Sequence, residues 1–313
     1  MVNGSNGGND KMQRIGWIDT WKGIAILLVV IGHVCQWRFP ISGWWLSKTI
    51  YSFHMPLFLF LSGLFAYKAI EAVERKEACL FVKKKAQQLL IPFLSWSILW
   101  MLFTRTPIEY FLQGGYIYWY LPTLFEFLLL FCLLRIINVS LIKGTVAFLL
   151  LLLSSVLLLY VIPQNCIVGS ILRINYTAYF YVFFIFGYLF FRCKSYIYNV
   201  LTTFFINTPP PHVFSDRNDA SSKSKRESFI IRIIRLLGMN TMSIYMMHYY
   251  LLLCLPKRFD GLVLFNHKVL FFLFVVLVSL CIALICIYAS KKLAYWRGTR
   301  FWLLGISDSK FAN

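Results

Sequence analysis

Long and almost uninterrupted runs of apolar residues dominate the chain and predict membrane-spanning helices. Runs such as 23–34, 145–162 and 270–287 approach or reach the roughly 20 residues that a helix needs to cross a bilayer. They do not alternate with a period of two, which favours helices over the strands of a β-barrel. Hydropathy thus predicts about eight spans, with uncertain ends. They lie at about residues 15–37, 50–70, 86–104, 117–135, 145–162, 174–191, 236–255 and 268–290.

The composition agrees with an all-α fold, a polytopic transmembrane helix bundle. Of the 313 residues, 59% are hydrophobic and only 14% are charged, whereas a soluble domain carries about 25% charged residues. A soluble fold of this length cannot hide so much apolar surface, so lipid must cover part of it. Soluble enzymes, secreted disulfide scaffolds and disordered proteins are excluded. The eight cysteines form no CxxC pair and mostly lie in apolar runs, so no metal site is expected.

The formal net charge of +19 has a topological explanation. With the N-terminus in the cytoplasm, most of the 31 lysines and arginines fall on the cytoplasmic side. This positive-inside bias predicts that both termini are cytoplasmic. The same excess attracts anionic lipid headgroups, so membrane lipids are expected partners and nucleic acid is not. We expect a multi-pass integral protein of the plasma (inner) membrane.

The chain divides into a membrane core and several polar segments. Residues 1–14 are predicted to be a disordered tail, and 15–206 hold the first six spans of the core. Residues 207–228, with three consecutive prolines and a Ser/Lys run, predict a flexible cytoplasmic loop. The last two spans fall within 229–292, and 293–313 are predicted to be a cytoplasmic tail.

Ionisable side chains inside the predicted spans are few, and each needs a reason because polar groups at membrane depth cost several kcal/mol unless paired or hydrated. In the first span, Asp19 and Lys22 lie one turn apart and can pair at the cytoplasmic end. His33 follows Asp19 by fourteen residues, about 21 Å at 1.5 Å per residue and close to four turns. Asp19 and His33 therefore point to nearly the same side and can line one passage.

His54 in the second span is expected to meet His33. The turn between the two spans is short, so both histidines lie about a turn inside the same external face. Three interpretations compete. An imidazole with a pKa near 6.5 suits general-base catalysis, two facing histidines can ligate haem, and histidines also hold helices together by hydrogen bonds. Haem is the weaker alternative, because no second pair of histidines accompanies this one.

Four further residues are candidates for contacts within the membrane. Glu126 lies inside the fourth span, where it fits either substrate contact or structural pairing. Trp119 and Tyr120 belong to an aromatic run that fits an interfacial belt as well as a site. His248 lies two turns beyond Asn240 on the same side of its predicted span, which fits a structural hydrogen-bond network or catalysis.

Five stretches together resemble the acyltransferase type 3 family of integral membrane O-acyltransferases, particularly its fucose 4-O-acetylase-like branch. They are Asp19 to His33, Phe53 to Gly63, Lys83 to Phe93, Trp119 to Pro122, and Leu237 to His248. The resemblance implies transfer of an acyl group, usually acetyl, from acetyl-CoA or another acyl-CoA. The acceptor it implies is a hydroxyl of a surface or exported glycan or of a lipid-linked sugar. It implies no permanently bound cofactor, and the family usually has more spans than hydropathy predicts here.

The same resemblance implies catalytic roles at the two ends of the first span. It makes His33 the essential residue and Asp19 and Lys22 functional. As a hypothesis, His54 orients substrate or stabilises the oxyanion. An acyl-histidine intermediate is equally compatible with the sequence.

The resemblance also implies sites for the donor and the acceptor. Lys22, Lys84 and Lys85 are candidates to bind the CoA phosphates. Lys85 and Gln88 stand where the family carries a basic Arg-x-x-Arg pattern, so a point charge and an uncharged amide replace two guanidinium forks. The implied substrate contacts are Glu126, Trp119, Tyr120 and His248.

Two functions of other classes stay open. A transporter or flippase could use Asp19, His33, His54 and Glu126 to relay protons or bind a polar cargo. It would favour broken helices in corresponding halves and an internal repeat, and the sequence shows neither. In a non-catalytic membrane scaffold, apolar replacements of the histidines would be tolerated.

Overall fold

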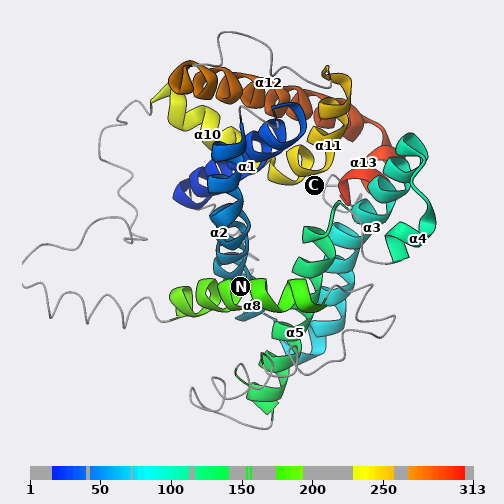
Figure 1. The fold of residues 1–313 in the computed structure, drawn as a ribbon. Helices are drawn as coiled ribbons and strands as arrows, with labels where there is room; N and C mark the ends of the chain where they lie inside the picture. The colour runs from blue at the N-terminus through cyan, green and yellow to red at the C-terminus, as the bar shows by residue number, and fades with distance from the viewer. Residues whose placement is uncertain are drawn as a thin grey trace, which may run out of the picture.

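Helices make up the regular structure of the part of the chain that the computed structural model describes. That part is residues 16–39, 43–71, 73–112, 117–140, 174–192, 228–256 and 267–306, with Leu153 and Val156. Figure 1 shows α1 and α2 joined at one end, with α3 and α5 on the opposite side of the bundle. The first helices are α1 (Gly16–Arg38), α2 (Trp44–Glu71), the 3₁₀ turn η1 (Arg75–Glu77), α3 (Ala78–Thr104), α4 (Ile108–Leu112) and α5 (Tyr120–Ser140).

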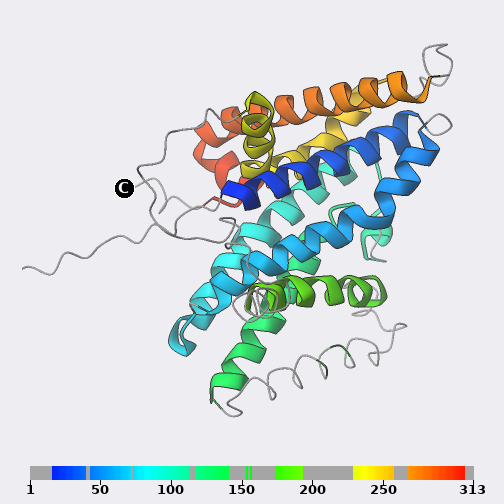
Figure 2. The same cartoon turned by 90° about the vertical axis from the view of Figure 1, so that its left-hand side faces the viewer.

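The later helices close the bundle over α1 and α2. They are α8 (Ile174–Arg192), α10 (Phe229–Met239), α11 (Thr241–Cys254), α12 (Lys268–Tyr295) and α13 (Arg297–Leu304). In Figure 1, α12 crosses above α1, α10 and α11, and α8 crosses the far end of α2. Figure 2 shows α12, α1 and α2 stacked as successive inclined layers. An all-α membrane bundle is therefore confirmed.

Fewer helices in the described residues can cross a membrane than hydropathy predicts. Five are long and apolar enough (in α1, α2, α3, α5 and α12), and a sixth is added if α10 and α11 count as one. The predicted span 174–191 corresponds to α8, a shorter apolar helix. The predicted span 145–162, the tail 1–14 and most of the loop 207–228 lie outside the described residues. The sidedness of the termini stays a prediction.

The span predicted over 236–255 is not one straight helix, because the chain bends by 86° between α10 and α11. The Asn240 side chain donates to the Leu236 carbonyl at 2.8 Å, and its backbone N–H donates to the Leu237 carbonyl at 3.0 Å. These bonds satisfy carbonyls at the end of α10 that a continuing helix would otherwise use. Asn240 is therefore the hinge between two helices and does not share a helix face with His248.

Glycines let helix backbones touch at two crossings. A Cβ on Gly63 of α2 would lie 2.1 Å from the Phe184 carbonyl oxygen of α8, and one on Gly187 would lie 1.9 Å from that of Phe60. At the other crossing, a Cβ on Gly238 of α10 would lie 1.7 Å from the Asp19 carbonyl oxygen of α1. Small residues at membrane helix crossings permit this close approach. The two crossings fix α8 against α2 and α10 against α1.

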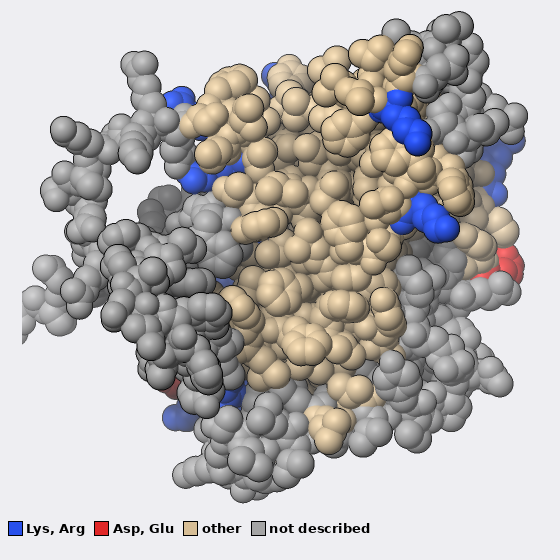
Figure 3. Space-filling model, turned by 60° about the vertical axis from the view of Figure 1, so that its left-hand side comes forward, with Lys and Arg blue, Asp and Glu red and all other residues tan. Residues whose placement is uncertain are grey.

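The described surface is apolar over a wide area, as a lipid-facing surface must be. In Figure 3 the described residues form a broad uncharged face, with lysines and arginines at its margins. Helix α13 lies within the segment predicted to be a tail, and it packs on α3. The Trp96 indole N–H donates to the Leu303 carbonyl at 2.8 Å, and Gly305, with φ of 65°, lies against the Gln88 carbonyl.

Candidate active site

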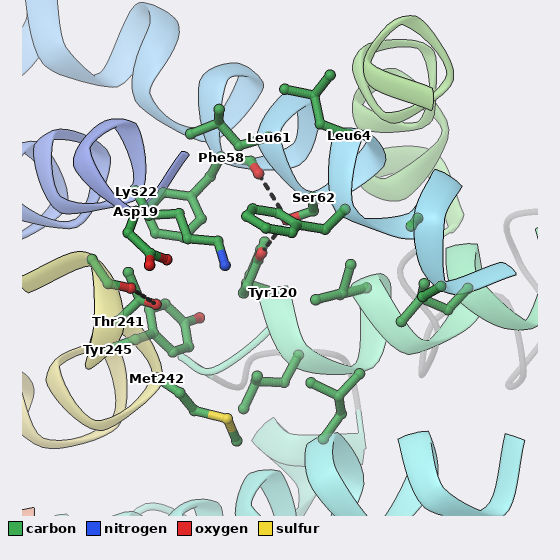
Figure 4. A pocket seen from close by; sticks show the side chains of 18 of the residues that line it. Asp19, Lys22, Phe58, Leu61, Ser62, Leu64, Tyr120, Thr241, Met242 and Tyr245 are labelled. Atoms are coloured by element: carbon green, nitrogen blue, oxygen red, sulfur yellow. Dashed lines mark hydrogen bonds between the residues drawn. The ribbon is translucent and has the colours of Figure 1, made fainter. Parts of the chain in front are cut away.

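A cavity of about 470 Å³ opens at the end of the bundle where α1 begins. Helices α1, α2, α3, α5, α8, α10 and α11 contribute to its lining, and leucine and phenylalanine are the commonest residues of its mainly apolar walls. Its charged lining residues are Asp19, Lys22 and Lys85. Figure 4 shows the carboxylate of Asp19 and the ammonium of Lys22 both directed into the space. The cavity combines cations with a long apolar wall, so it suits an elongated ligand with an anionic end.

Local packing explains why the two charges of α1 reach the cavity. Asp19 and Lys22 lie one turn apart, and Gly238 brings α10 onto the backbone of α1 at Asp19. The Lys22 ammonium lies 3.4 Å from the centroid of the Phe65 ring of α2. An aromatic face attracts a cation when little water is present. Phe65 therefore helps hold a positive charge in an otherwise apolar cavity.

Hydroxyl groups line the deeper end of the cavity. The Ser62 hydroxyl donates to the Phe58 carbonyl at 2.8 Å and accepts from the Tyr120 hydroxyl at 2.7 Å (Figure 4). The ring of Tyr245 on α11 also lines the cavity, edge-on to Tyr120 with 5.5 Å between centroids. Tyr120, a predicted substrate contact, is thus part of the cavity wall.

His33 lies in a cluster of aromatic rings near the other end of α1. Its ring stacks on that of His248 from α11, with 5.2 Å between centroids and 11° between planes. Its Nε2 atom is 2.5 Å from the Tyr249 hydroxyl, and its Nδ1 atom contacts the Tyr51 hydroxyl. Side chains from α2 and α11 therefore hold the two ring nitrogens of His33.

The hydrogen bonds around Tyr51 determine which nitrogen of His33 carries the proton. The Tyr51 hydroxyl donates to the Gln36 side-chain oxygen at 2.5 Å. Its oxygen must then accept from His33, so the proton is on Nδ1. The Nε2 lone pair is left to accept from the Tyr249 hydroxyl. In its neutral form, His33 therefore directs its basic nitrogen toward Tyr249.

His54 meets His33 through the ring of Tyr51, which contacts both imidazoles, so the two predicted histidines come together without stacking. Its ring lies edge-on to Tyr51, with 4.9 Å between centroids, and Tyr51 separates it from His33. Its Nδ1–H donates to the Ile50 carbonyl at 2.9 Å. His248 joins the predicted pair from the first two helices and stacks on His33, because α11 packs alongside α1.

One turn of α11 joins the cavity to the histidine cluster. Tyr245 lines the cavity, and its ring centroid is 6.2 Å from that of His248, which stacks on His33. The buried Tyr118 supports this turn by donating to the Met246 carbonyl at 2.9 Å. A group bound at the deep end of the cavity is therefore separated from His33 by two aromatic rings.

Comparison with known proteins identifies the family of this chain. The model of a family described as "Acyltransferase domain" matches residues 15–209, more than half of the chain. The chain belongs to this acyltransferase family. Two curated relatives are both called nodulation protein NolL. The protein from Mesorhizobium japonicum is 43% identical over 90 residues, and the one from Sinorhizobium fredii is 46% identical over 87 residues. These matches cover 27% and 26% of this chain but only 23% of each relative. No solved structure matches significantly.

Besides the three histidines, three further predicted site residues of this acyltransferase lie apart from the cavity lining. Lys84 is exposed, whereas its neighbour Lys85 lines the cavity, because consecutive residues of a helix face different directions. Trp119 stacks on Phe180 of α8 at 5.2 Å. The partly buried Glu126 does not line the cavity, although one of its carboxylate oxygens is buried without a hydrogen-bond partner in the described residues.

Several residues of the site were missed by the sequence analysis. Tyr249, Tyr51 and Ser62 all contact candidate residues, but none is ionised at neutral pH, so a search for charged groups in apolar runs passes over them. Tyr249 is also 216 residues from His33 in the chain. Only Tyr51 carried a signal, because it stands three residues before His54. Among the described residues, no group of three His, Cys, Asp or Glu side chains could hold a metal ion.

Proposed function

We propose that this chain is a membrane O-acyltransferase that moves an acyl group from acyl-CoA to a hydroxyl of a surface or exported glycan, or of a lipid-linked sugar. Acetyl is the expected acyl group. The observation that carries the proposal is the position of His33, which is oriented by Tyr51 and lies two rings from a cavity with a cationic lining. Family membership supports acyl transfer. The positions of the cavity and of His33 support transfer from the Lys22 end of α1 toward the His33 end.

The donor enters through the cavity. Lys22 and Lys85 bind phosphate oxygens of acyl-CoA, because an ammonium offers several charged donors to an anion. The apolar wall accepts the pantetheine arm, as apolar pockets with a few polar groups commonly do for extended ligands. The thioester then lies near Ser62 and Tyr120, whose hydroxyls are available to orient its carbonyl. Asp19 faces the same space and positions the lysines by its charge.

His33 activates the acceptor hydroxyl. Its Nε2 atom removes the hydroxyl proton, either directly after the substrate displaces the Tyr249 hydroxyl or through that hydroxyl. The oxygen forms a bond to the acyl carbon, the carbon–sulfur bond breaks, and the thiolate leaves as CoA and takes up a proton. General-base help of this kind contributes about 10²–10⁴-fold. Positioning and electrostatics supply the rest of the acceleration.

The location follows from the two substrates. The long apolar helices require a lipid environment. Acyl-CoA is cytoplasmic, and the acceptor glycan is made or exported at the cell boundary. We therefore place the protein in the plasma (inner) membrane, with the Lys22 end of α1 in the cytoplasm as the positive-inside rule requires.

The test replaces His33 in cells that make the acceptor. Surface glycans are analysed by mass spectrometry from cells with wild-type protein, with His33→Ala, and with no protein. We expect one mass difference, matching acetyl or another acyl group, that disappears in both altered strains. His267→Ala, an exposed histidine at the start of α12, is the matched control and should keep the modification. A glycan that is translocated but never acylated would favour the transporter instead.

A further inference from the structure

One buried nucleophilic atom has no part in the mechanism above. The side chain of His248 is completely buried, and its Nε2 atom has no hydrogen-bond partner among the described residues. Its Nδ1 atom lies 2.9 Å from the Ile244 carbonyl, which can only accept, so Nδ1 carries the proton. Nε2 therefore bears a lone pair inside the protein. A buried polar atom without a partner costs free energy, so it calls for an explanation.

The position of His248 places that lone pair between the two substrates. On the donor side, Tyr245 stands one turn earlier on α11 and forms the cavity wall. On the acceptor side, the ring of His33 lies parallel at 5.2 Å. His33 itself has both nitrogens engaged, by Tyr51 and by Tyr249. Of the two stacked imidazoles, His248 is the one whose basic nitrogen has no hydrogen-bond partner among the described residues.

We propose that His248 is the nucleophile that carries the acyl group from the donor cavity to the acceptor, as an acyl-imidazole. The inference rests on the proposed function and replaces its single displacement at the thioester by two displacements through a covalent intermediate. The two histidines then have different roles. His248 takes the acyl group from CoA, and His33 activates the hydroxyl that receives it.

The two steps balance in bonds and charge. In the first, Nε2 of His248 attacks the thioester carbon, a nitrogen–carbon bond forms and the carbon–sulfur bond breaks. This leaves an acyl-imidazolium whose Nδ1–H still bonds to Ile244, and a CoA thiolate that takes a proton from the cytoplasmic side. In the second, the acceptor oxygen attacks the acyl carbon and its proton passes to Nε2 of His33. The nitrogen–carbon bond breaks, His248 returns to the neutral form, and His33 releases the proton on the acceptor side.

This division explains how two substrates on opposite sides of a membrane react without meeting. The thioester has to pass the Tyr245 ring to reach His248, but CoA never has to pass the layer formed by the stacked rings of His248 and His33. Only the small acyl group crosses that layer, attached to a side chain of α11. The stacked geometry keeps the acyl carbon within reach of a hydroxyl bound at His33, as a near-attack arrangement requires.

The test omits the acceptor. Full-length protein in lipid nanodiscs is mixed with radiolabelled acetyl-CoA, and separately with acetyl-CoA and labelled CoA to measure exchange. Wild type should take up about one acetyl per chain, on the peptide that contains His248, and should catalyse exchange. Neutral hydroxylamine should remove the label, since it cleaves acyl-imidazoles readily.

Three variants separate a nucleophile from a packing residue. His248→Gly should lose both the label and the exchange. Added imidazole should restore exchange by filling the space left by the ring. Such rescue would also show that the variant is folded. His33→Gln should keep the label and exchange but fail to acylate the glycan. His267→Gly should behave like wild type in every assay.

The outcomes distinguish this inference from the function on which it rests. Glycan acylation by wild type without exchange or label would overturn the acyl carrier and leave the transferase standing. Label on Tyr245 or Tyr249 in place of His248, or undiminished exchange in His248→Gly, would also overturn it. Label on His248 with no glycan ester formed in cells would support the carrier and refute the proposed acceptor.

Discussion

The crossing of α10 over α1 can be tested by adding a single methyl group. In Gly238→Ala the new Cβ would lie 1.7 Å from the carbonyl oxygen of Asp19 and 3.0 Å from the backbone nitrogen of Gly23. Both neighbours are backbone atoms, so no side chain can rotate away. Carbon atoms in good contact are about 3.5–4.0 Å from their neighbours. The two helices must therefore separate by more than an ångström.

The expected cost follows from two opposing effects. Alanine is a better helix former than glycine by about 0.5–1 kcal/mol, whereas overpacking at a tight contact costs about 1–3 kcal/mol. The clash at Gly238 lies between rigid backbones, so we expect overpacking to dominate. At about 2–4 °C per kcal/mol for a large domain, the apparent melting temperature should fall by several degrees. Asp19 and Gly238 both line the cavity, so the KM for acyl-CoA should rise as well.

The assay compares thermal unfolding in detergent and donor kinetics for Gly238→Ala and a matched control. Gly298→Ala in α13 adds the same methyl group where nothing lies within 4 Å, so it should raise stability by about 0.5–1 kcal/mol. The two substitutions should thus have opposite signs. A Gly238→Ala protein that melts at or above the wild-type temperature with an unchanged KM would refute this account of the helix crossing.

Three further substitutions test the site. Tyr51→Phe removes the acceptor of the His33 Nδ1–H bond. It should lower kcat about tenfold with little change in the KM for acyl-CoA, since one such bond contributes about 1.4 kcal/mol. A change in KM alone would contradict the proposed role of Tyr51. Lys85→Gln should raise the KM for acyl-CoA about tenfold or more. The same substitution at its exposed neighbour, Lys84→Gln, should leave that KM unchanged. Equal effects of the two substitutions would argue against donor binding in the cavity. Glu126→Gln should keep near-wild-type kinetics, because Glu126 does not line the cavity. An inactive but correctly folded Glu126→Gln protein would place Glu126 in the site.

Features that depend on neighbours in sequence were predictable. Each long apolar run that falls within the described residues forms a helix, because a backbone in lipid must satisfy its own hydrogen bonds. The placement of Asp19 and Lys22 on one face of α1 needs only the geometry of a helix turn, and both side chains do line the cavity. The same local argument made His33 of α1 a candidate, but it could not say which residues His33 would contact.

The partners of these residues depended on how the helices cross. His33 stacks on His248 and bonds to Tyr249, more than two hundred residues away, because α11 passes beside α1. Hydropathy averages over a window, so it could not detect that Asn240 breaks an apolar segment by bonding back to Leu236. The sequence by itself determined a membrane helix bundle with a polar face on its first helix. Only the tertiary structure decided which imidazole faces His33, because glycine-mediated contacts between backbones set the position of each helix.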